Sequence, residues 1–213
     1  LTSKNTYDGQ ELKKALSEMT SAFNRLVKYK KVKKNLLGYL RATEVTVNSK
    51  DNSYNQHMHV LVFVKSTYFK DSENYLTQAE LTELWQKALK VNYRPIVNVK
   101  AVKPRKTVKK DKDSLLGAVY ETAKYPVKSV DYLSGSHDQN LKRVEDLEKG
   151  LAHKKLFSFG GLFKTIRKEL HLADVEDENS DLTRTDSEDD KDATTGEEII
   201  AYWNWERKNY FIK

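Results

Sequence analysis

The sequence predicts an α+β fold, in which a central antiparallel sheet of about five strands has helices packed mostly on one face. Two observations predict this class. Segments with apolar residues at helical spacing alternate with short segments rich in β-branched and aromatic residues, and two of the latter are separated only by a turn. The 213 residues, 38% of them hydrophobic, suffice for one well-filled domain, alone or with appendages.

The first predicted element is an amphipathic helix that begins after Asp8. Its apolar residues recur every three or four positions from Leu12 to Val27. Asp8 is the expected N-cap, because its carboxylate can accept hydrogen bonds from the free N–H groups of the first turn. Five lysines between positions 28 and 34 follow, and they are available to phosphate groups or simply to water.

Residues 36–47 and 57–64 are predicted to pair as a β-hairpin. Both segments are rich in β-branched and aromatic residues, and turn-forming residues lie between them. We take Asp51 and Asn52 as the two residues of the turn, which fixes the expected register of the two strands.

Further elements complete the predicted sheet and its helical layer. Thr77 and Glu80 form a capping-box pattern before a helix that is expected to end ahead of Arg94-Pro95. The elements expected after it are a strand at 96–102, a basic loop at 103–112, a helix at 115–125, a helix from Asp138 to 151, a strand at 156–159, a break at Gly160-Gly161 and a helix at 162–170.

Charge is distributed unevenly along the chain. Residues 174–198 contain twelve acidic and two basic residues, a local charge of −10, so the rest of this protein of net charge +7 carries +17. We therefore predict a domain at 1–173, an acidic linker at 174–198 and an aromatic C-terminal segment at 199–213 that packs on the domain. Such a basic domain is expected to bind nucleic acid, although a solvated lysine-rich surface also fits.

Composition excludes several classes of protein. No run of about 18 apolar residues and no signal-peptide pattern is present, so a cytoplasmic protein that does not contact membrane is expected. The absence of cysteine excludes disulfides, a thiolate nucleophile and cysteine-bound zinc. Any metal ion must therefore be held by histidines and carboxylates.

His57 and His59 are candidate metal ligands. Strand side chains alternate between the two faces, so both imidazoles point to one side of the predicted sheet. With the turn given above, Glu44 lies opposite His59 and Thr46 opposite His57, which adds a carboxylate to that face. This set suits Mg²⁺ or Mn²⁺ with open positions. A metal-free Glu44–His59 ion pair remains an alternative, and a one-residue register change would turn Glu44 to the other face.

A candidate nucleophile lies in the segment 117–126. On a helix, Glu121 and Tyr125 are neighbours at i and i+4. A tyrosine can attack the phosphorus of a phosphodiester, a neighbouring carboxylate can later activate water, and Lys124 can stabilise the developing negative charge. The chain contains twelve tyrosines, so composition alone does not select Tyr125.

Three separated segments carry a resemblance to a known family. They are Gly38-Tyr39-Leu40-Arg41-Ala42-Thr43-Glu44-Val45-Thr46-Val47-Asn48, Tyr54-Asn55-Gln56-His57-Met58-His59-Val60-Leu61 and Glu121-Thr122-Ala123-Lys124-Tyr125. The chain resembles the replication initiators (Rep) of small rolling-circle plasmids of Gram-positive bacteria, which belong to the HUH endonuclease superfamily. Their first motif, a strand, is matched only by Leu1-Thr2, so a truncated N-terminal strand is expected.

The resemblance implies a role for each candidate residue. His57 and His59 match the histidines of the family's metal motif, and Glu44 matches its acidic third ligand. Tyr125 matches the nicking tyrosine. The two residues that accompany it also have counterparts: Glu121 matches the glutamate thought to activate the terminating water, and Lys124 matches the lysine that accompanies the nucleophile.

The implied activity is nicking and strand transfer at a plasmid double-strand origin, through a single-stranded nick site and a 5′-phosphotyrosine link. The implied fold is the HUH arrangement, with the histidine strand central in the sheet. A host helicase is the expected partner, and the oligomeric state is left open. A relaxase or transposase with the same chemistry, and a non-catalytic nucleic-acid binding module, are the alternatives.

Overall fold

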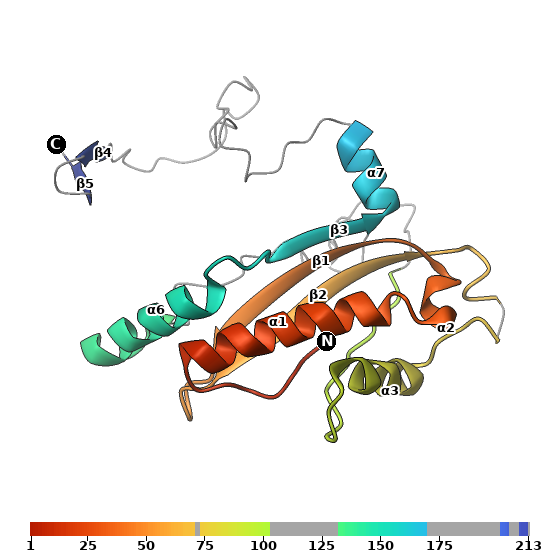
Figure 1. Ribbon diagram of the computed structural model, residues 1–213, viewed down its shortest axis with the longest axis horizontal. Coiled ribbons are helices and arrows are strands. Elements are labelled where there is room, and N and C mark those ends of the chain that lie inside the picture. The colour runs from red at the N-terminus through yellow and green to blue at the C-terminus, as the bar shows by residue number, and fades with distance from the viewer. Residues whose placement is uncertain (71–72, 103–131, 170–200, 205–208, 213) are drawn as a thin grey trace. The chain divides into compact units, whose positions relative to one another are not determined.

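The computed structural model describes residues 1–70, 73–102, 132–169, 201–204 and 209–212 (Figure 1). The chain divides into two compact units, Leu1–His171 and Leu172–Lys213. In the second unit, the strands β4 (Ala201–Asn204) and β5 (Asn209–Ile212) pair as an antiparallel hairpin. The first unit contains a sheet and helices, so the predicted α+β class is confirmed.

The sheet of the first unit is antiparallel and has the strand order β2-β1-β3. Its strands are β1 (Leu36–Val47), β2 (Tyr54–Val64) and β3 (Phe157–Gly161). In the described residues it therefore has three strands rather than the expected five. At the other edge of β2, Thr6 and Tyr54 exchange backbone hydrogen bonds of 3.0 and 2.7 Å, and Thr2 forms a second isolated bridge to His57.

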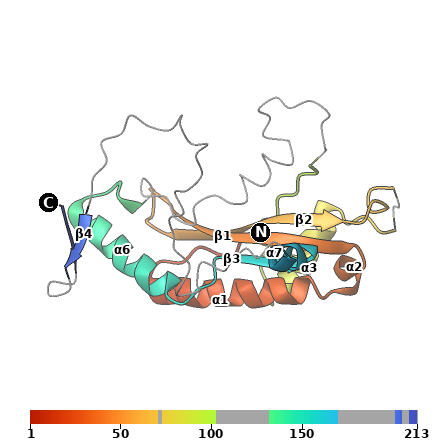
Figure 2. The ribbon, with the colours of Figure 1, turned by 90° about the horizontal axis from the view of Figure 1, so that it is seen from above.

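Four helices lie on one face of this sheet: α1 (Gly9–Leu26), α2 (Lys30–Lys33), α3 (Gln78–Leu89) and α6 (His137–Leu151). The fifth described helix, α7 (Leu162–Glu169), directly follows β3, and its Phe163 ring packs against Phe63 of β2, which faces the other side. Figure 2 shows α1 running along one side of β1 and β2. Phe23 of α1 and Trp85 of α3 enclose Met58 of β2 in the main hydrophobic cluster. Because side chains alternate along a strand, His57 and His59 face the other side.

The helix boundaries follow from capping, mostly as predicted. The Asp8 side chain accepts hydrogen bonds from the N–H groups at the start of α1, and Thr77 forms a capping box with Glu80 at α3. Helix α6 differs from the prediction. Its N-cap is Ser136, whose hydroxyl accepts from the N–H of Gln139, whereas the expected cap, residue 138, lies inside the first turn.

One prediction about the later segments is wrong, one is confirmed, and others are untested. Residues 96–102 do not form a strand; the carbonyl of Ile96 accepts hydrogen bonds from the N–H and the hydroxyl of Thr2, at 3.1 and 3.2 Å. The predicted break at Gly160-Gly161 is confirmed: β3 ends at Gly161, whose φ is +57°, and α7 begins at the next residue. A Cβ on Gly160 would lie 2.1 Å from the Tyr39 ring. The expected basic loop at 103–112 and helix at 115–125 lie outside the described residues.

The hairpin of β1 and β2 has a longer loop than predicted. The N–H of Asn48 donates to the carbonyl of Ser53 at 2.8 Å, so residues 49–52 form the loop. Glu44 consequently lies opposite His57, and Ala42 lies opposite His59. The predicted register was wrong by two residues. Because two residues are one full period of a strand, Glu44 still faces the same side as the histidines.

A buried carboxylate fixes α6 to the rest of the unit. Asp146 of α6 accepts hydrogen bonds from the N–H of Gly9 at 2.9 Å, the hydroxyl of Tyr54 at 2.9 Å and the ammonium of Lys142 at 2.8 Å. Burial alone raises the pKa of Asp146, but these three donors outweigh it and hold the pKa below its ordinary value. The charged carboxylate therefore ties α6 to α1 and to the start of β2.

This network gives a stability prediction. Tyr54→Phe removes one donor from the charged Asp146, and we expect the free energy of unfolding in urea to fall by about 1–3 kcal/mol at neutral pH. Since the pKa of Asp146 is lowered by folding, the stabilisation is present above its ordinary pKa of about 4 and is lost as the pH falls through the folded value.

The loss caused by Tyr54→Phe should accordingly shrink in acid. The matched control is Tyr7→Phe, because the Tyr7 side chain is exposed, and this change should leave the unfolding free energy within about 0.5 kcal/mol. A Tyr54→Phe protein as stable as its parent at pH 7 would contradict the account.

Candidate metal centre

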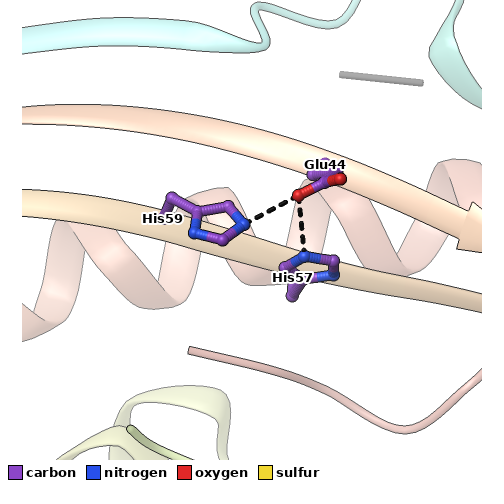
Figure 3. Close-up of side chains that lie close together, drawn as sticks. All are labelled: Glu44, His57 and His59. Atoms are coloured by element: carbon purple, nitrogen blue, oxygen red, sulfur yellow. Dashed lines mark hydrogen bonds and ion pairs between the residues drawn. The ribbon is translucent and has the colours of Figure 1, made fainter. Parts of the chain in front are cut away.

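Glu44, His57 and His59 converge on one point of the sheet face that lies away from α1. One carboxylate oxygen, Oε2 of Glu44, lies 3.0 Å from Nε2 of His57 and 2.7 Å from Nε2 of His59 (Figure 3). One potential ligand atom from each residue lies within 4.8 Å of the others. Within the residues that the structure describes, this is the one cluster with metal-ligand spacing.

Strand geometry produces this convergence. Glu44 is in β1, the central strand, and lies directly opposite His57 in β2. His59 is two residues further along β2, so it faces the same side and reaches Glu44 along the diagonal. Two imidazoles and one carboxylate are thus presented by hydrogen-bonded backbone rather than by a loop, which fixes their relative positions.

The three side chains are unequally exposed. The Glu44 side chain is 8% exposed, whereas those of His57 and His59 are 21% and 27% exposed. A carboxylate withdrawn from water needs cationic or hydrogen-bonding partners. The partly open imidazole side of the cluster is where a bound ion would keep free positions for water or a phosphate oxygen.

The protonation state of His57 suits metal binding. Burial lowers the pKa of His57, and this effect outweighs the attraction of the Glu44 carboxylate. The neutral imidazole is the form that binds a metal ion. Its Nδ1 lies 3.4 Å from the carbonyl oxygen of Asn55, which can accept a hydrogen bond when the proton is on Nδ1; Nε2, which faces Glu44, would then be the nitrogen that binds an ion.

The same face of the sheet is apolar next to the cluster. Leu40 and Ala42 of β1 and Leu61 of β2 are all buried, and their strand positions place them on the side of Glu44. Apolar surroundings strengthen electrostatic interactions because they lower the local dielectric constant. A charge bound by the cluster would therefore act more strongly there than at an exposed surface.

The outcome for the predicted site residues is divided. The structure brings Glu44, His57 and His59 together on one face. Tyr125, Glu121 and Lys124 lie outside the described residues, so their place at the site stays a prediction. The contact between Nδ1 of His57 and the backbone carbonyl of Asn55 was not predicted. Every residue type carries a backbone carbonyl, so the sequence gives no signal for this contact.

None of the described helices combines the length and the apolar composition that crossing a lipid bilayer requires.

Comparisons with known proteins identify the family. A replication protein of Staphylococcus aureus is 54% identical over 213 residues, which cover all of this chain and 88% of that protein. A protein of Lactiplantibacillus plantarum named protein rep is 53% identical over 214 residues, covering all of this chain and 66% of that protein. No solved structure matches the chain significantly. Residues 1–211 match the replication-protein family, and with these identities they show that the chain belongs to it, as its motifs predicted.

Proposed function

We propose that this chain is a metal-dependent DNA nickase and strand transferase that initiates and terminates rolling-circle replication of a plasmid. The observation that carries the proposal is the convergence of Glu44, His57 and His59 on one face of the sheet, in a chain that belongs to a replication-protein family. The names of the relatives favour replication over a relaxase or transposase. The enzyme acts on plasmid origin DNA in the bacterial cytoplasm.

The donor set fits a divalent cation held by Glu44, His57 and His59. Two imidazole nitrogens favour Mn²⁺ over Mg²⁺, because Mg²⁺ prefers oxygen ligands throughout. When bound, the ion supplies a Lewis acid that polarises a phosphate oxygen of the DNA. Glu44 contributes negative charge, and the neutral His57 contributes a lone pair held in place through its Nδ1.

The covalent chemistry is assigned to the segment 117–126. The hydroxyl of Tyr125 loses its proton as its oxygen bonds to phosphorus, the bond from phosphorus to the 3′ oxygen breaks, and that oxygen takes up a proton, so no proton is gained or lost overall. The products are a 5′-phosphotyrosine and a free 3′-OH that primes synthesis. Lys124 stabilises the charge that develops on phosphorus, and Glu121 takes a proton from the water that ends the cycle.

Binding of DNA is assigned to the basic surface. Lys28, Lys30 and the other lysines up to position 34 are exposed around α2, where they can neutralise phosphates of origin DNA in a salt-dependent manner. A host helicase would then open the duplex and expose the single-stranded nick site.

Metal dependence of cleavage is the first functional prediction. Cleavage of labelled single-stranded origin DNA, followed by denaturing electrophoresis, should stop with a chelator and return when Mn²⁺ or Mg²⁺ is added. His57→Ala should lower the cleavage rate at least about a hundredfold, because a ligand is lost. His137→Ala is the control, since His137 is an exposed histidine in the first turn of α6. Normal cleavage by His57→Ala in chelator would contradict the assignment.

Direct binding of the metal is a separate prediction. Titration calorimetry of the protein without DNA should show one Mn²⁺ site, and Glu44→Gln should weaken it by roughly tenfold or more, because the amide keeps the size of the side chain but not its charge. Glu11→Gln is the matched control, because Glu11 is exposed and lies in the first turn of α1. Equal Mn²⁺ affinity for the Glu44→Gln protein and its parent would remove Glu44 from the ligand set.

Substitutions of Tyr125 and Glu121 should separate the two steps of the reaction, which are nicking and the hydrolysis that ends the cycle. Tyr125→Phe should abolish the covalent protein–DNA band, because the attacking oxygen is missing. Glu121→Ala should still nick but should hydrolyse a second strand slowly, so that more protein stays joined to DNA. Equal loss of both steps in the Glu121→Ala protein would mean that Glu121 only orients Tyr125 or the metal.

A further inference from the structure

Three aromatic rings gather in the loop that connects β2 to α3. The centroids of Tyr68 and Phe69 are 4.9 Å apart, those of Tyr68 and Tyr75 are 5.4 Å apart, and those of Phe69 and Tyr75 are 6.2 Å apart. Phe69 is 60% exposed and Tyr75 is 42% exposed. Aromatic side chains of this size are usually buried in the core. A group of exposed aromatic side chains therefore indicates a binding surface.

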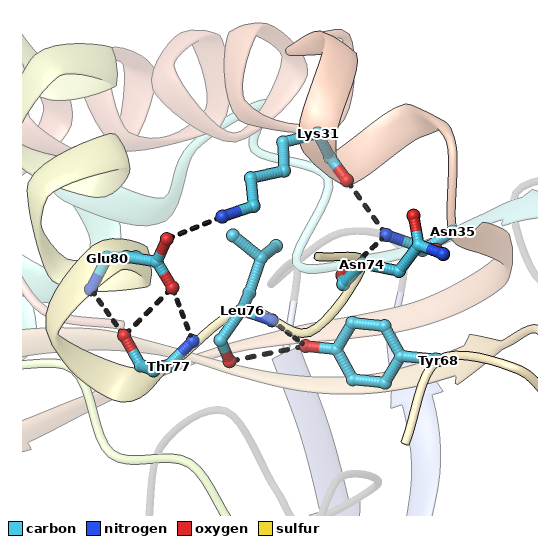
Figure 4. Close-up of polar contacts among 7 residues, drawn as sticks. All are labelled: Lys31, Asn35, Tyr68, Asn74, Leu76, Thr77 and Glu80. Atoms are coloured by element: carbon cyan, nitrogen blue, oxygen red, sulfur yellow. Dashed lines mark hydrogen bonds and ion pairs between the residues drawn. The ribbon is translucent and has the colours of Figure 1, made fainter. Parts of the chain in front are cut away.

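Hydrogen bonds fix the described parts of this loop to each other and to the end of α2 (Figure 4). The hydroxyl of Tyr68 accepts from the N–H of Leu76 at 3.1 Å and lies 3.3 Å from its carbonyl oxygen. The buried amide of Asn35 donates to the carbonyl of Asn74 at 2.9 Å and to that of Lys31 at 3.1 Å. The rings are therefore presented by a braced loop, which lowers the entropy lost on binding.

Lysines lie on the segments next to the aromatic cluster. The bonds of Asn35 place the end of α2 beside the loop, and Lys33 and Lys34 are exposed there. The loop itself has Lys65 and Lys70 against Asp71 and Glu73 in its sequence, so the positive surplus comes from α2. Aromatic faces next to lysines match the two parts of a single-stranded nucleic acid, its bases and its phosphates.

We propose that Tyr68, Phe69 and Tyr75 form a stacking platform for unpaired bases of single-stranded DNA. The proposal rests on the proposed function and adds a base-binding surface to it. In this proposal Phe69 and Tyr75 offer their exposed ring surface to bases, Tyr68 holds both rings through its contacts with them, and the lysines contact the flanking phosphates. A protein partner is disfavoured, because exposed aliphatic side chains are absent from the described part of the loop.

The platform follows the same strand that carries the two histidines. Val64, the last residue of β2, is five residues beyond His59, which is about 17 Å of extended chain. Tyr68 is four residues further along the chain.

The test compares two strands with equal numbers of phosphates: oligo-dT of about 15 nucleotides and an abasic strand of the same length. Stacking is tolerant of sequence, so oligo-dT is a valid probe. The double variant Phe69→Ala and Tyr75→Ala should bind oligo-dT at least roughly tenfold more weakly than the parent in fluorescence anisotropy. It should bind the abasic strand as the parent does, because the lysines are unchanged.

Two controls make the outcome decisive. Tyr7→Ala removes another exposed ring, at 56% exposure, and should not change the affinity for oligo-dT. A variant with Phe69→Trp and Tyr75→Trp keeps stacking surfaces and should restore the affinity if the loop is folded. Equal loss on both strands, no loss on either, or a changed oligomeric state in the alanine variant without loss of oligo-dT binding would overturn the platform.

The proposed function is judged separately in the same preparation. If the parent forms a covalent DNA adduct with Mn²⁺ while the alanine variant binds oligo-dT like the parent, only the platform is wrong. If the parent forms no adduct but the predicted loss on oligo-dT is measured, the nickase proposal is wrong and the platform stands.

Discussion

The two-residue period of the β-hairpin is the constraint on which the candidate site depends. Glu44 shares one oxygen between His57 and His59 only because all three side chains face the same side of β1 and β2. A register change of one residue would send the carboxylate into the hydrophobic cluster around Met58. The opposite face is filled by α1 and α3, so the same alternation that builds the core leaves the other side of the sheet for chemistry.

Local patterns predicted the parts of this molecule that depend on near neighbours. The caps at Asp8 and Thr77 involve residues within one helical turn, and the alternation that pairs His57 with His59 needs two residues. The hairpin loop was predicted too short, because Asp51 and Asn52 are good turn residues but the chain uses both within a longer loop. The error did not affect the predicted site, because a shift of two residues leaves each side chain on the same face of the sheet.

Contacts between distant segments could not be predicted from the sequence. Asp146 meets Gly9 and Tyr54 across 137 and 92 positions of the chain, and nothing in its helical pattern distinguishes it from an exposed acid. Residues 96–102 have the composition of a strand, but no ladder forms over them, and the backbone of Ile96 bonds to Thr2. In each case tertiary contacts override local preference.

The central claim is that the two imidazoles and Glu44 hold one divalent ion, and electron spin echo envelope modulation of protein-bound Mn²⁺ tests it most directly. The account predicts ¹⁴N couplings from two histidine nitrogens, with one lost in His57→Ala and one in His59→Ala. A spectrum of bound Mn²⁺ with oxygen ligands only, unchanged by either substitution, would contradict the account.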